Sequence, residues 1–355
     1  MTADLTSLAV FVVCYALFVF FPRWRSWIAC AGAAVLVLSG AITWRAAVLE
    51  KINWNVMGLF FGTLVLAEFF MLSRVPAFLA EWLVDRTATA RTAMLVLCAL
   101  AGLISAFVEN VAVVLLVAPV ALSLAEKVKL NPVPLLIGIA VSSNLQGTAT
   151  MIGDPPSMIL AGYQRMGFFD FFWYQGRPSI FFAVEIGALA SLVVLALLFR
   201  RARGPVEILP VERVRSWVPT VLLGLLMLGL SVATVFDAEF TWYAGTLALG
   251  LAAVGLVWYR FVAHWGGLSR LARELDWDTT LFLMGVFVLV GTLADSGWLD
   301  RLADTLSGVV GARPLPAFAL IVCLAVVVSG FVDNVPFLIA MLPVAEKVAG
   351  SAGAP

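Results

Sequence analysis

The sequence predicts an all-α polytopic membrane protein with inverted structural repeats, re-entrant helical hairpins and a broken transmembrane helix. Three observations carry this prediction: a strongly apolar composition, an internal duplication, and polar residues that interrupt apolar segments. The 355 residues are 63% hydrophobic and only 12% charged, whereas soluble domains carry about 25% charged residues. Many apolar runs reach the ~17–25 residues that cross a bilayer as a helix.

The apolar runs delimit a series of helices along the chain. Two further stretches, 75–89 and 295–311, are amphipathic and are expected to lie at the membrane interface. The first run has no basic residue before it and no small-residue cleavage site after it, so it indicates a membrane span and not a secretory signal. The helices are expected at 5–21, 26–43, 55–73, 92–108, 111–128, 133–147, 153–163, 179–199, 217–236, 241–259, 278–294, 314–330 and 335–349.

The second part of the chain repeats the first. Trp54 and Trp277 lie 223 residues apart, as do Gly62 and Gly285, and the sequence AEKV occurs at 125–128 and again at 345–348. Order over this range indicates an internal duplication. If the arginine-rich linker is cytoplasmic by the positive-inside rule, an odd number of crossings separates the copies. The repeats are then inverted, as in many secondary transporters.

The expected organisation has five parts. They are N-terminal scaffold helices (1–50), a first repeat (51–199) with a hairpin at 92–128 and a broken helix at 133–163, a cytoplasmic linker (200–216), further scaffold helices (217–259), and an incomplete second repeat (275–355) with a hairpin at 314–349.

Two similar heptapeptides, SAFVENV and SGFVDNV, place a carboxylate and an amide inside apolar segments. The joints are too short for two full spans, so Glu109-Asn110 and Asp333-Asn334 are expected at the tips of re-entrant hairpins. The arm that ends leaves free carbonyls, which suit a cation. The arm that begins leaves free N–H groups, which suit an anion. The alternative is a structural turn with a helix-capping acid, which does not explain why the tip occurs twice.

A second polar interruption, SSNLQGTATMIGDPPSMI, occupies residues 142–159. Pro155 and Pro156 break helical pairing, and one short apolar helix lies on each side. The alternative is a simple loop outside the membrane. The candidate binding residues supply neutral oxygens, close backbone approach or a charge; they are Ser143, Asn144, Gly147, Thr148, Thr150 and Asp154.

Two other acids, Glu68 and Glu185, also lie in apolar runs. Each is a candidate proton carrier or a packed, neutral core acid. The four cysteines stand singly and the only histidine lies in a basic loop, so neither a zinc site nor a disulfide framework is expected. No catalytic sequence pattern of an intramembrane enzyme is found, and zero net charge gives no indication of nucleic-acid binding. The lipid bilayer and a small ion or anion are the expected partners.

The stretch SAFVENVAVVLLVAPVALSLAEK, followed by NPVPLLIGIAVSSNLQGTATMIGDPPSMI, resembles the ion-transporter superfamily with the citrate-transporter-like domain. That group contains arsenite permeases, sodium–proton antiporters, the melanosomal P-protein and divalent-anion symporters. The resemblance implies a multi-pass secondary transporter of the cell membrane, often a homodimer. It would move an inorganic or organic anion or exchange Na⁺ for H⁺, with Na⁺ or H⁺ as coupling ion and no other cofactor.

In the symporter branch, the hairpin tip and the broken helix form a clamshell around Na⁺ and a substrate carboxylate. By resemblance, that role falls to Glu109, Asn110, Asn144, Gly147, Thr148 and Asp154. Symporters usually have a Ser-Asn-Thr tip, and the acidic tips here are more similar to the antiporter branches. Family members also have a second broken helix after the second hairpin, which this sequence lacks. We therefore expect either a fragment of a transporter or a chain that lost its second half-site. The second case leaves open a non-transporting remnant or assembly partner.

Overall fold

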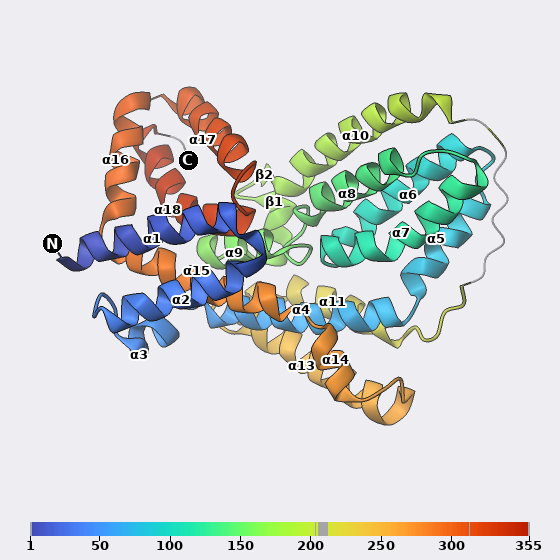
Figure 1. Ribbon diagram of the computed structural model, residues 1–355, viewed down its shortest axis with the longest axis horizontal. Coiled ribbons are helices and arrows are strands. Elements are labelled where there is room, and N and C mark those ends of the chain that lie inside the picture. The colour runs from blue at the N-terminus through green and yellow to red at the C-terminus, as the bar shows by residue number, and fades with distance from the viewer. Residues whose placement is uncertain (1, 203, 205–211, 312, 354–355) are drawn as a thin grey trace. The chain divides into compact units, whose positions relative to one another are not determined.

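The computed structural model describes residues 2–202, 204, 212–311 and 313–353, and these are helical almost throughout (Figure 1). This confirms the predicted all-α polytopic membrane protein. Within the described residues, five helical segments are long and apolar enough to cross a bilayer. They are α4 (Trp54–Leu72), α7 (Asn110–Lys127), α10 with its last turn (Ile180–Arg201), α13 with its last turn (Tyr243–Ala263) and α15 (Trp277–Asp295).

The chain forms two compact units, and each draws on segments far apart in the sequence. One unit contains Met1–Met57 and Asp276–Pro355, and the other contains Gly58–Leu275. In the first unit, α15 packs against α1 and α2, while α18 packs against α15, α16 and α17. Besides α15, the helices of this unit are α1 (Thr2–Phe20), α2 (Arg25–Leu38), the short α3 (Trp44–Ala46), α16 (Trp298–Val310), α17 (Pro314–Ser329) and α18 (Asn334–Ser351).

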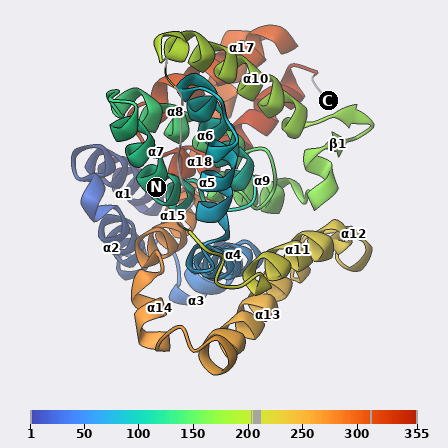
Figure 2. The ribbon, with the colours of Figure 1, turned by 90° about the vertical axis from the view of Figure 1, so that its right-hand side faces the viewer.

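The second unit is built around α6, which packs against α5, α7, α8 and α10. Figure 2 shows α11 beside α13, with α12 at the end where the chain turns back. Besides α7, α10, α13 and most of α4, the helices of this unit are α5 (Val75–Asp85), α6 (Ala90–Ser105), α8 (Val133–Gly147), α9 (Pro155–Gln164), α11 (Val218–Ser231), α12 (Ala233–Phe236) and α14 (Leu268–Glu274).

A few local elements differ from those expected. The strands β1 (Trp173–Tyr174) and β2 (Arg177–Pro178) pair antiparallel in a small hairpin that the hydropathy pattern does not reveal. Helix α2 ends at Leu38 and not near residue 43, because Gly40 adopts φ +75°, a left-handed conformation that suits glycine and stops a helix. The two stretches expected to be interfacial, 75–89 and 295–311, form α5 and α16.

The predicted linker (200–216) lies partly outside the described residues. Its described end runs beside the start of α5. The Arg74 guanidinium pairs with Glu212 at 2.6 Å, and the Arg215 N–H donates to the Ser73 carbonyl at 2.9 Å. These contacts hold that end of the linker against the second unit.

Asp237 fixes the turn between α12 and α13. Its carboxylate accepts the Trp242 N–H at 2.7 Å, the Tyr243 N–H at 2.9 Å and the Thr241 hydroxyl at 2.9 Å. Desolvation alone would raise the pKa of Asp237, but these hydrogen bonds lower it to about 2. Because the folded pKa is depressed, the stabilisation is present at neutral pH and is lost only as pH falls toward that value.

The two glycines that the duplication aligns both lie at close helix crossings. A Cβ on Gly62 would come within 2.5 Å of the carbonyl carbon of Ala248 in α13, and one on Gly285 within 2.7 Å of that of Ala29 in α2. Only a residue without a side chain permits such an approach. The long helix of each sequence copy thus packs on a scaffold helix from the other part of the chain: α4 on α13, and α15 on α2.

We expect Gly62→Ala and Gly285→Ala each to destabilise the protein by about 1–3 kcal/mol, because an added methyl group forces the two helices apart. The measurement is the midpoint of thermal unfolding in detergent. Gly250→Ala is the matched control, since a Cβ there meets nothing within 4 Å, and it should leave the midpoint unchanged or slightly raised. Equal midpoints for Gly62→Ala and Gly250→Ala would contradict the close crossing.

Candidate functional site

The predicted hairpin and the predicted broken helix are neighbours in the second unit. Residues 106–109 join α6 to α7, and residues 148–154 separate α8 from α9. Helix α8 packs against both arms of the hairpin, and Figure 1 shows α6, α7 and α8 side by side. Helix α7 is long enough to cross a bilayer by itself, so re-entry of this hairpin stays a prediction.

Hydrogen bonds connect the hairpin joint to the broken helix. The buried Thr150 hydroxyl donates to the Ala106 carbonyl. The Ser143 hydroxyl donates to the Asn110 carbonyl at 3.1 Å, and the Asn110 side-chain amide donates to Asn144 Oδ1 at 2.9 Å. Ala106 follows the last residue of α6, where carbonyls lack helical partners and need such a donor. The polar residues predicted from the two motifs therefore meet.

Glycine permits the closest contact in this region. A Cβ on Gly153 would lie 2.3 Å from the Gly147 carbonyl oxygen and 2.7 Å from the Ser105 carbonyl oxygen. Two helix-terminal carbonyls thus converge on Gly153. Gly147 also lies close to Asp154, whose Oδ2 would be 3.4 Å from a Cβ at that position.

The two acids of the site each begin a helix. Glu109 accepts the Ala112 N–H at 3.3 Å at the start of α7, and Asp154 accepts the Ser157 N–H at 2.9 Å at the start of α9. The interpretation of Glu109 as a helix-capping acid is therefore correct, and Asp154 caps α9 in the same way. Asp154 is only 5% exposed.

Both acids also line one small cavity of about 10 Å³, which is roughly the room for one water molecule. Thr63 of α4 lines the same cavity and donates its hydroxyl to the Phe60 carbonyl at 2.8 Å. Sequence reasoning missed Thr63. The available signal was a lone hydroxyl beside Gly62 in an otherwise apolar helix.

Asn110, the residue after Glu109, lines a second, wider cavity of about 380 Å³. Asn144 also lines it, together with apolar side chains of α7 and α8. Glu109 and Asn110 are consecutive, yet they line different cavities. The hydroxyls of Ser143, Thr148 and Thr150 line neither cavity; Thr148 donates to the Leu145 carbonyl at 2.9 Å, so all three hold backbone groups.

The second tip has different surroundings, in the first compact unit. Asp333 accepts the Val335 N–H at 3.1 Å, and Asn334 is the first residue of α18. Asp333 Oδ2 also pairs with Arg25 Nη1 at 2.5 Å. Arg25 in turn binds Asp278 at 2.9 Å and Thr279 at 2.8 Å. The second tip is thus held to the start of α2 and the start of α15.

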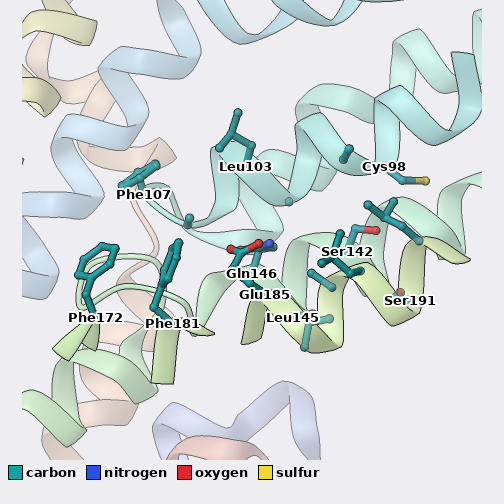
Figure 3. A pocket seen from close by; sticks show the side chains of 16 residues that line it. Cys98, Leu103, Phe107, Ser142, Leu145, Gln146, Phe172, Phe181, Glu185 and Ser191 are labelled. Carbon is teal, nitrogen blue, oxygen red and sulfur yellow. The ribbon is translucent and has the colours of Figure 1, made fainter. Parts of the chain in front are cut away.

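The two candidate proton carriers lie apart from the acidic pair. Glu68 is in α4 but is not among the residues that line either cavity. Glu185 is in α10 and lines a third cavity, bounded by α6, α8 and α10 (Figure 3). Within the described residues, no group of three or more His, Cys, Asp or Glu side chains could hold a metal ion.

Comparison with known proteins places this architecture among transporters. The family model described as "Citrate transporter" matches residues 15–355. An uncharacterized transporter of Mycobacterium tuberculosis is 29% identical, with 99% of this chain and 82% of the relative covered. The magnetosome protein MamN of Magnetospirillum gryphiswaldense is 30% identical, with 96% and 79% covered. A 46 kDa membrane protein of Mycobacterium leprae is 27% identical, with 97% and 81% covered. The chain belongs to the citrate transporter family.

Proposed function

We propose that this protein is a secondary active transporter that couples the movement of a citrate-like organic anion to Na⁺ or H⁺. The observation that carries the proposal is that two consecutive residues line two different cavities. Glu109, the last residue of the joint, lines the small acidic cavity, and Asn110, the first residue of α7, lines the wider cavity with its amide. The citrate transporter family model supports the substrate class. The broken helix supplies the second wall of each cavity.

The small cavity suits the coupling ion. Two carboxylates, Glu109 and Asp154, line a space of about 10 Å³, which excludes a tricarboxylate by size alone. An ionised acid inside a bilayer costs about 2.5–3.5 kcal/mol on insertion scales. A proton or a dehydrated Na⁺ between the two acids removes part of that cost and their mutual repulsion. The Gly147 and Ser105 carbonyls near Gly153 add negative dipoles close by.

The wider cavity suits the anion. Helix α7 begins at Asn110, and a helix N-terminus carries about half a positive charge with unpaired N–H groups. The Asn144 side chain accepts from Asn110 through its oxygen, so its two N–H groups stay available to a carboxylate. A volume of about 380 Å³ falls within the range of roughly 300–1,000 Å³ for small-molecule sites.

The proposal includes inverted repeats with re-entrant hairpins, a location in the cell membrane and a homodimer. The equivalent crossings at Gly62 and Gly285 support the duplication. The family resemblance supports the other features. The second tip is proposed to act mainly as an anchor, because Arg25 already pairs with Asp333.

Glu109→Gln should reduce ion-driven citrate uptake into proteoliposomes to background. The glutamine amide neither takes up and releases a proton nor carries the negative charge that attracts a cation. The matched control is Glu126→Gln, an exposed acid near the other end of the same helix, which should retain full uptake. Uptake is measured under an imposed Na⁺ gradient and, separately, an imposed pH gradient, which identifies the coupling ion. Wild-type activity in Glu109→Gln would rule out this role. A folded wild-type protein with no flux of any anion would favour the non-transporting alternative.

Asn144→Asp should raise the KM for the anion about tenfold or more, since a carboxylate replaces the amide donors and repels the substrate; tenfold corresponds to about 1.4 kcal/mol. Asn131→Asp is the control, because its side-chain oxygen accepts the Val133 N–H at 3.0 Å in an exposed loop, and aspartate retains that bond. An unchanged KM in Asn144→Asp would argue against an anion site in the wider cavity.

Asp333→Asn should lower the free energy of unfolding by about 1–3 kcal/mol, because it removes one of the two charged acceptors of the partly buried Arg25. The control is Asp304→Asn, because Asp304 and its partner Lys347 lie on an exposed surface, where an ion pair contributes little stability. Thermal unfolding of both variants is compared, and the ion dependence of uptake is then measured. A changed ion dependence in Asp333→Asn would make Asp333 an ion ligand.

A further inference from the structure

The cavity that Glu185 lines is next to the proposed transport site and has no role in the proposed transport. It has a volume of about 490 Å³ and lies between α6, α8 and α10 (Figure 3). Most of its wall is apolar, with Leu103, Leu145 and Leu192 among the lining residues. Its size and its mixture of apolar wall and few polar groups are typical of small-molecule sites.

Its polar groups have no partners in the described part of the chain. The Ser142 hydroxyl is buried and makes no hydrogen bond. No hydrogen bond or ion pair involves the Gln146 amide or the Glu185 carboxylate within the described residues. Gln146 and Glu185 both line the cavity, and their polar ends overlap in the view of Figure 3. Buried polar groups without partners, such as the Ser142 hydroxyl, are uncommon and call for an explanation, whereas Gln146 and Glu185 are half-buried and face the cavity.

Aromatic rings form one end of this cavity. Phe107, Phe172 and Phe181 lie together at one side of the view in Figure 3, and the ring centroids of Phe172 and Phe181 are 4.6 Å apart. The faces of such rings attract organic cations. A carboxylate beside aromatic rings is therefore a combination that selects a cationic head group and repels an anion such as citrate.

The cavity opens at an apolar surface of its unit. Only 11% of the apolar window of α10 is buried, and Leu103 and Leu189, which line the cavity, are exposed. An apolar surface of this kind on a spanning helix faces lipid. An occupant can therefore enter from the bilayer with its apolar chain.

We propose that this cavity binds a lipophilic ammonium compound from the membrane. Its ammonium group is held by Glu185, with the Gln146 side-chain oxygen as a further acceptor, and its apolar chain lies along the leucines. The ion pair offsets the cost of a carboxylate in apolar surroundings.

Phe107 connects this cavity to the transport site, because it also lines the small acidic cavity. An occupant that fixes Phe107 should hinder any rearrangement of the joint at 106–109. Binding should therefore inhibit transport. This consequence rests on the proposed function, whereas binding itself does not.

The test measures binding of decylammonium to the wild-type protein in nanodiscs by titration calorimetry, with empty nanodiscs as the background. Decanol, the neutral analogue, and decanoate, the anionic one, are titrated in parallel. We expect saturable binding of decylammonium only, and a Kd at least tenfold weaker in Glu185→Gln. Glu126→Gln should bind like the wild type. Equal affinity for decanol, or an unchanged Kd in Glu185→Gln, would overturn the proposal.

A second variant covers the case in which Glu185→Gln does not fold, as judged by gel filtration. Ala188→Phe fills the cavity from α10, where Ala188 lines it, and should abolish saturable binding. Retained binding in Ala188→Phe would also overturn the proposal. Transport is then assayed with decylammonium present. Binding without inhibition would remove only the link through Phe107, and inhibition lost in Ala188→Phe would support that link.

Discussion

The site depends on how two interrupted helices satisfy the backbone groups that each interruption frees. In apolar surroundings an unpaired backbone group costs several kcal/mol. The joint at 106–109 and the break at 148–154 reduce that cost together, since the Thr150 hydroxyl donates to the Ala106 carbonyl at the end of α6. Ser143 adds a hydrogen bond from α8 to the Asn110 carbonyl. Gly153 then permits two carbonyl ends to approach. Some polar residues of the motif are therefore polar because they hold the backbone, and fewer are left to face a ligand.

The same constraint explains why two similar tips have different surroundings. Glu109 and Asp333 both cap the helix that follows, and the repeated heptapeptide encodes that local geometry. The partners differ because Asp278 has an uncharged counterpart in the first copy, Asn55, which stands 223 positions before it. A charged cluster holds the second tip, whereas the first tip lines a cavity with a second acid. The two tips therefore share the capping turn and differ in the charges around it.

Hydropathy was sufficient to predict nearly every helix, because apolar length and proline or glycine positions are local properties. The break after Gly147 followed from the motif for the same reason, whereas the next helix begins at Pro155, two residues after the expected start at 153. Thr63 could not be predicted as a cavity residue, since its place in the same cavity as Asp154 depends on how α4 packs against the rest of its unit. The crossings of α4 with α13 and of α15 with α2 are also non-local. Gly62 and Gly285 indicated that another helix approaches closely, but the sequence alone does not show which helix it is.

The placement of Glu109 and Asn110 at the start of α7 gives a physical basis for the proposed coupling. A cation that neutralises the acidic cavity removes a repulsive charge within one residue of the amide-lined cavity, so anion binding there becomes more favourable. By linkage, the anion must strengthen cation binding by the same factor. No long pathway is needed, because one rigid helix start forms a wall of both cavities. Any ligand that displaces this turn, including one that acts on Phe107, changes both affinities together.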